Sequence, residues 1–94
     1  MPTLRKNTER QRYEILTDGG EVAGFADYHD QDGAVAMPHT VVEPAHEGQG
    51  LAGQLTRFAL DDIRASGRKV VPQCSYVRAW ISRHPDYADL LAAP

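Results

Sequence analysis

The 94-residue sequence is notable first for what it lacks, and each absence excludes a class of protein. It has one cysteine, Cys74, which cannot form an internal disulfide, so nothing indicates an oxidising compartment. No stretch approaches the roughly 20 apolar residues that a membrane-spanning helix needs. The segment Met1–Tyr13 is polar and lacks the apolar core of a secretory signal. We therefore expect a cytoplasmic protein without a membrane partner.

The sequence also lacks an excess of basic residues and a recognisable set of metal ligands. Its formal net charge is −3, which argues against nucleic acid as a partner. The four histidines (His29, His39, His46 and His84) do not have the spacing of a metal site, and we expect no metal. Hydrophobic residues make up 41% and charged residues 24%, as in ordinary globular proteins. The length predicts one domain, residues 1–94, of which 1–11 are expected to be partly disordered.

The first half of the chain predicts an antiparallel meander of three strands. Apolar and polar residues alternate at its start, and later apolar runs are separated by glycine-containing turns. Pro38 lies inside the third run and indicates an edge, a bulge or a bend, because proline cannot donate a backbone hydrogen bond. The predicted strands are Arg12–Leu16, Glu21–Asp30 and Ala34–Val42, and the turns are Asp18–Gly20 and Gln31–Gly33.

The second half predicts a helix, a short strand, a second helix and an apolar tail. Apolar residues recur every three or four positions from Leu51 to Ile63, and Gly67 is suited to the left-handed position that ends a helix. The remaining elements are a strand at Lys69–Val71, a helix from Ser75, its expected cap, to His84, and a docked tail with Tyr87, Leu90 and Leu91. The fold class is therefore α/β of the α+β type, with a mainly antiparallel sheet of three N-terminal strands, then helix, strand and helix.

The most informative stretch is the glycine-rich turn that joins the third strand to the first helix. Its glycines permit positive φ angles and close approach of a ligand. The first N–H groups of a helix have no internal partner, and the helix dipole adds positive potential there. Together these features suit a phosphate or pyrophosphate. The alternative is that Gly48 and Gly50 only make a tight connection. The turn has neither a Walker ending nor the βαβ context of a dinucleotide site.

Three stretches, Met37–Leu55, Lys69–Val77 and Arg83–Tyr87, resemble the small single-domain branch of the GNAT superfamily of N-acetyltransferases. The phosphate motif of that superfamily is Arg/Gln-x-x-Gly-x-Gly/Ala. Here Gly50 and Ala52 match the motif, whereas Glu47 replaces its basic or amide residue. The resemblance implies that acetyl-CoA is the cofactor. It also implies the binding residues, which are Glu47, Gly48, Gln49, Gly50, Leu51, Ala52 and Gly53 for the pyrophosphate and Val41 and Val42 for the pantetheine arm.

Two residues are candidates for catalysis. Cys74 precedes a helix start, which lowers a thiol pKa, and the resembled branch carries a cysteine there near the cofactor. The Cys74 thiol is expected to accept the acetyl group as a nucleophile or to contact the thioester. The alternative is that Cys74 is simply a small buried residue. Glu43 ends the third strand and is suited to be a general base, directly or through water, or is a solvated charge. His39, His46 and Tyr76 are weaker candidates for proton transfer. The structural interpretations are a partly buried sheet residue for His39, a surface loop residue for His46 and a packing residue beside Trp80 for Tyr76, and the last two are favoured.

These observations lead to an N-acetyltransferase that binds acetyl-CoA and acetylates a primary amine, on a small molecule or a protein, whose identity the sequence does not reveal. The alternative is a catalytically weak sensor or interaction module that binds CoA or acetyl-CoA. A third hypothesis is a small interaction domain in which the glycines only make a turn. The fold by itself does not distinguish them.

Overall fold

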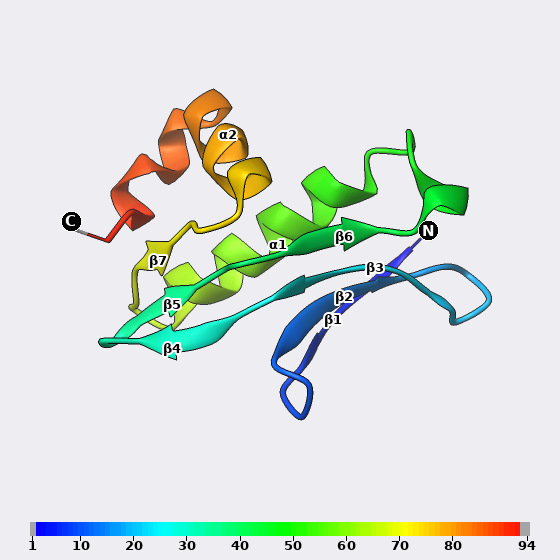
Figure 1. Ribbon diagram of the computed structural model, residues 1–94, viewed down its shortest axis with the longest axis horizontal. Coiled ribbons are helices and arrows are strands. Elements are labelled where there is room, and N and C mark those ends of the chain that lie inside the picture. Colours follow the sequence, from blue (N-terminus) through cyan, green and yellow to red (C-terminus); the bar gives the residue numbers. More distant parts are fainter. Residues whose placement is uncertain (1, 93–94) are drawn as a thin grey trace.

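The computed structural model describes residues 2–92, which form a twisted, mainly antiparallel β-structure with two α-helices (Figure 1). The strands are β1 (Thr3–Asn7), β2 (Arg12–Leu16), β3 (Val22–Asp27), β4 (His29–Gln31), β5 (Ala34–Ala36), β6 (Thr40–Val42) and β7 (Val70–Val71). The helices are α1 (Leu51–Ala65) and α2 (Ser75–Arg83), with the short 3₁₀ helices η1 (Pro44–His46) and η2 (Pro85–Leu90).

The strands form two hydrogen-bonded sheets that diverge where the chain passes Pro38. One sheet has the order β1-β2-β3-β6 and is antiparallel, and the other has the order β4-β5-β7, with β5 and β7 parallel. Because β5 pairs with β7 whereas β6 pairs with β3, the chain changes neighbours between Ala36 and Thr40. Beyond the bend, β6 is an edge strand whose second side is not paired in the sheet.

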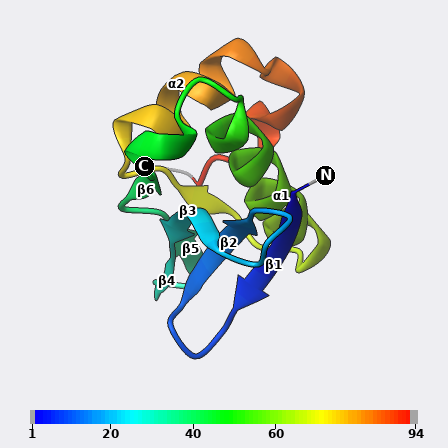
Figure 2. The same cartoon turned by 90° about the vertical axis from the view of Figure 1, so that its right-hand side faces the viewer.

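The hydrophobic core lies between the four-stranded sheet and α1. Figures 1 and 2 show α1 running across one face of the sheet, with α2 and the C-terminal segment beside it. The buried face of α1 includes Leu55, Leu60 and Ile63, which pack in the same cluster as Tyr13 and Ile15 of β2. This is the apolar stripe expected from the helical spacing, and it determines which face of α1 packs on the sheet.

The structure confirms the fold class and most of the predicted elements, but it divides two of the three predicted strands. The first strand, Arg12–Leu16, has the predicted bounds. The single strand predicted at Glu21–Asp30 is instead β3 and β4, which are separated at Tyr28. The third is divided at Met37–His39 into β5 and β6, because Pro38 cannot continue the ladder.

The sequence reasoning missed strand β1. Residues 1–11 were expected to be partly disordered, yet Thr3–Asn7 pairs with β2 along its full length. Leu4 packs against the core, and the Lys6 ammonium lies 2.9 Å from the Asp62 carboxylate. The polar composition of the segment is that of an edge strand, in which charged side chains disfavour pairing with other chains. Met1 lies outside the described residues.

The helices follow the prediction with two corrections. Helix α1 ends at Ala65, and Gly67 adopts the expected left-handed conformation with φ of 77°. The N-cap of α2 is Cys74, not Ser75, and no side-chain hydrogen bond caps this helix. In the tail, Tyr87 and Leu90 are buried in η2 as expected, but Leu91 is 42% exposed. Neither described α-helix is long and apolar enough to cross a membrane.

Candidate functional site

The connection from β6 to α1 forms a turn that leaves the start of the helix open. Gly48 and Gly50 have φ angles of 81° and 74°, which side chains other than glycine rarely adopt. Gly50 is the N-cap of α1, and no side chain caps the helix. A Cβ atom added at either glycine would meet nothing within 4 Å. Backbone conformation therefore requires these glycines, and the space beside them is open to a ligand.

A pocket of about 160 Å³ lies beside this turn. Seven of the nine predicted cofactor-binding residues line it, together with His46 and Tyr76, which the prediction did not include. Val41 does not line this pocket and is 40% exposed, and Gln49 is also exposed. Tyr76 comes from α2, and no local pattern in the sequence places it against the turn. The lining residues from the predicted set are Val42, Glu47, Gly48, Gly50, Leu51, Ala52 and Gly53.

The edge of β6 that has no partner strand lies next to the glycine-rich turn. Strand β6 pairs with β3 through Gly24, Phe25 and Ala26, and the sheet has no further strand beyond it in residues 2–92. An exposed strand edge offers a row of backbone N–H and C=O groups that an extended ligand can pair with. The site therefore combines a glycine-rich turn, at which the start of α1 is uncapped, with a strand edge that leads away from it.

Cys74 lies on the same side, at the other end of β6 from the turn. Its N–H donates to the Met37 carbonyl at 2.9 Å, and its Sγ is 3.7 Å from the Thr40 hydroxyl. Burial raises the pKa of the thiol, but hydrogen bonds from the Val77 N–H, the Thr40 hydroxyl and N–H, and the Tyr76 N–H together lower the pKa below its usual value. The start of α2 and strand β6 thus favour the thiolate.

The second catalytic candidate, Glu43, is not brought next to Cys74. Glu43 is exposed, and its backbone N–H donates to the Ala23 carbonyl at 2.8 Å. It lies three residues beyond Thr40, which is about 10 Å along an extended chain. The two candidates therefore lie at opposite ends of β6. His39 is 71% exposed and lies 3.6 Å from the Asp27 carboxylate, whereas His46 lines the pocket at the turn.

The sequence matches the model of the GCN5-related N-acetyl-transferase family over residues 12–90. The chain belongs to this family. No curated protein is significantly similar to it in sequence. The matched region contains the turn, β6 and both α-helices, so the site described above lies wholly within the acetyltransferase domain. In residues 2–92, no three His, Cys, Asp or Glu side chains gather in an arrangement that holds a metal ion.

Solved structures of GNAT-family proteins share the fold of this chain. A GCN5-like protein from Staphylococcus aureus superimposes with a TM-score of 0.74 at 17% identity, over 98% of this chain and 89% of its own. A protein of the GNAT family from Desulfovibrio desulfuricans gives a TM-score of 0.62 at 19% identity, over 78% of this chain and 52% of its own. The GNAT N-acetyltransferase YhbS from Escherichia coli, crystallised in complex with CoA, gives 0.58 at 28% identity. That match covers 65% of this chain and 38% of YhbS.

Proposed function

We propose that this protein is an acetyl-CoA-dependent N-acetyltransferase that transfers an acetyl group to a primary amine. The observation that carries the proposal is the uncapped start of α1, with Gly48 and Gly50 at positive φ, directly beside the free edge of β6. Membership of the acetyltransferase family and the CoA complex of the YhbS relative support it.

The turn fits the pyrophosphate of CoA. The first N–H groups of α1 have no partner within the helix, and no side chain satisfies them from the N-cap. Backbone N–H groups and the helix dipole together favour an anion there. Glu47, which departs from the family motif, is an exposed side chain, so its negative charge is screened by water. Glu47, Gln49 and the turn glycines are therefore assigned to the pyrophosphate through their backbone.

The pantetheine arm is assigned to the free edge of β6. An arm that leaves the turn along Val42 and Val41 would reach Thr40 and then Cys74. Such pairing uses main-chain hydrogen bonds, so it does not require particular side chains at Val41 and Val42. The thioester carbonyl would then lie near the bend at Pro38, where the two sheets diverge.

The reaction requires a deprotonated amine that is aligned with the thioester carbonyl, and much of the rate gain comes from this positioning. Cys74 is proposed to contact the thioester or to accept the acetyl group, because its thiol is half-buried and its pKa is lowered. Glu43 is proposed to accept the proton of the incoming ammonium through water, since it lies at the other end of β6.

The decisive experiment measures binding of CoA and acetyl-CoA by calorimetry to the wild type, Gly50→Trp and Gly67→Trp. Both glycines have positive φ and open surroundings, and they lie at opposite ends of α1, so the two variants carry equivalent backbone strain. We expect Gly50→Trp to weaken binding by about tenfold or more and Gly67→Trp to bind like the wild type. Equal binding by all three proteins would contradict the assignment of the turn.

Turnover then separates an enzyme from a CoA-binding module. Release of free CoA from acetyl-CoA is followed with a panel of primary amines, with Cys74→Ala as the comparison. Amine-dependent release above the uncatalysed rate supports the transferase. Tight binding of acetyl-CoA without turnover on any amine favours the sensor or interaction module instead. Absence of binding by the wild type would leave the third hypothesis, an interaction domain.

A further inference from the structure

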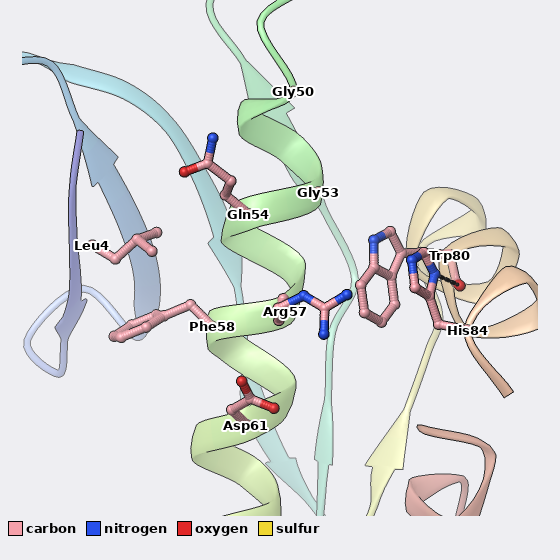
Figure 3. Close-up of a pocket in the computed structure, with 9 residues that line it drawn as sticks. All are labelled: Leu4, Gly50, Gly53, Gln54, Arg57, Phe58, Asp61, Trp80 and His84. Atoms are coloured by element: carbon pink, nitrogen blue, oxygen red, sulfur yellow. Dashed lines mark hydrogen bonds between the residues drawn. The ribbon is translucent and has the colours of Figure 1, made fainter. Parts of the chain in front are cut away.

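The four-stranded sheet has one face that α1 covers and one face that neither described α-helix covers (Figures 1 and 2). Successive side chains of a strand point to opposite faces of a sheet. In β1, Leu4 lines a hollow of about 440 Å³ along α1 (Figure 3), and Lys6 pairs with Asp62 of the same helix. Arg5, which lies between them in the strand, therefore points to the uncovered face. We call this side of the sheet the open face.

Two arginines on the open face are held by one buried carboxylate. The Glu14 side chain is 1% exposed, and its oxygens accept hydrogen bonds from Nε of Arg5 at 2.6 Å and from Nε of Arg12 at 2.7 Å. The Arg12 guanidinium also lies over the Phe25 ring, 4.5 Å from its centroid. Within residues 2–92, neither arginine donates a hydrogen bond through Nη. We call Arg5, Arg12 and Glu14 the arginine site; two positive charges and one negative give it a net charge of +1.

A carboxylate lies on the open face closer to β6. Asp27 of β3 is opposite Arg12 in the strand register, yet Arg12 binds Glu14 instead. The Asp27 carboxylate lies 3.6 Å from Nδ1 of His39, and the Asp27 side chain is 36% exposed, so it is accessible to a ligand. The open face thus presents a negative charge beside β6 and a positive site on β1 and β2.

The open face meets the proposed position of the thioester at the edge of β6. Val42 lines the pocket beside the start of α1, so it points to the covered face. Alternation then places Val41 and His39 on the open face, which agrees with the contact between His39 and Asp27. The edge of β6 has no further strand beyond it in residues 2–92. A thioester along this edge is therefore accessible to an acceptor that lies on the open face.

From these contacts we propose that the acceptor binds across the open face and is an aliphatic primary amine that carries a carboxylate. The inference rests on the proposed function, since that function places the thioester at the edge of β6. The ammonium group lies beside Asp27, and the carboxylate accepts hydrogen bonds from the Nη groups of Arg5 and Arg12. The net charge of +1 at the arginine site matches one carboxylate better than a doubly charged phosphate.

The sheet also sets the length of this acceptor. The edge of β6 and strand β2 are two strand spacings apart, about 10 Å. Methylene groups between the two charged ends contact the exposed Val41 and its register partner Phe25. In the reaction, the amine nitrogen bonds to the acetyl carbon as the C–S bond breaks. The ammonium loses one proton to Glu43 through water, as proposed above, and a second proton to the CoA thiolate.

The test compares 8-aminooctanoate with octylamine, which has the same chain without the carboxylate, by release of free CoA from acetyl-CoA. We expect the wild type to use 8-aminooctanoate with a kcat/KM about tenfold higher. In Arg5→Gln the two amines should become nearly equal, while Arg12 still pairs with Glu14 and keeps the sheet folded. Arg83→Gln removes the same charge from an exposed position on α2 and should keep the wild-type preference. Calorimetry with acetyl-CoA checks that the cofactor affinity of each variant is unchanged.

Three results would overturn the inference and leave the proposed function in place. One is an equal kcat/KM of the wild type for octylamine and 8-aminooctanoate. The second is an unchanged preference in Arg5→Gln. The third is a preference for 1,8-diaminooctane, which replaces the carboxylate with a second ammonium group. Binding of acetyl-CoA without turnover of any amine would refute the inference and leave a CoA-binding module. Failure of the wild type to bind acetyl-CoA would refute the proposed function and the inference together.

Discussion

Gly24 of β3 is the position at which a single methyl group should most disturb the candidate site. A Cβ atom there would lie 2.7 Å from the Val41 carbonyl oxygen, and 3.2 and 3.3 Å from Cγ2 and Cα of Val42. Two of these three atoms belong to the backbone of β6, which cannot rotate away as a side chain does. Gly24→Ala therefore requires β6 to move relative to β3, and β6 is the strand assigned to the pantetheine arm.

The expected cost follows from overpacking in a buried position. Forcing one extra carbon into a close-packed region costs about 1–3 kcal/mol, and replacing glycine restricts the unfolded chain, which returns about 0.4–1 kcal/mol. We expect a net loss of about 1–2 kcal/mol in the free energy of unfolding. For a domain of this size that corresponds to a melting temperature lower by roughly 4–16 °C. Affinity for CoA should also fall, because the free edge of β6 is displaced.

Gly53→Ala is the matched control, because it makes the same chemical change without the clash. A Cβ atom at Gly53 would lie 3.7 Å from Trp80 Nε1 and 3.8 Å from the Tyr76 hydroxyl, which are ordinary contacts. Helix propensity then favours alanine by up to about 1 kcal/mol. Urea and thermal unfolding of both variants check the prediction. Gly24→Ala as stable as the wild type, or Gly53→Ala destabilised equally, would refute the reasoning.

Two further predictions concern ionisable groups. The Glu14 side chain is 1% exposed, and although burial raises its pKa, hydrogen bonds from Arg12 and Arg5 at 2.7 and 2.6 Å lower it overall. A lowered folded-state pKa stabilises the protein above the unfolded value of 4.5, and this contribution disappears as the pH falls through the folded pKa. Glu14→Gln should therefore lower the free energy of unfolding by about 1.5–3 kcal/mol at pH 7, and by progressively less below pH 4.5, in urea unfolding. A cost that does not change with pH would contradict the pairing. Thr40→Val removes one hydrogen bond to Cys74, so the midpoint of thiol alkylation against pH should rise; an unchanged midpoint would mean that Thr40 does not favour the thiolate.

The sequence alone was sufficient to predict the elements that depend on residues close together along the chain. The three- and four-residue spacing in Leu51–Ile63 identified α1, because one apolar face of a helix has that period. Gly67 marked its end, and Pro38 marked the bend that separates β5 from β6, because each residue restricts its own backbone. The turn at Gly48 and Gly50 was recognisable for the same reason, and with it the resemblance to the acetyltransferases.

The tertiary structure decided which residues meet across elements. It made a strand of the polar segment Thr3–Asn7, because β2 offered it an edge, and it brought Cys74 to Thr40 while leaving Glu43 at the other end of β6. It also placed Arg57 against α2 and η2, where its guanidinium contacts the Trp80 and Tyr87 side chains. Backbone preference and periodicity are properties of neighbours along the chain, so the sequence determines them directly. Contacts between distant segments depend on how the faces of α1, α2 and the sheet pack, which only the folded protein determines.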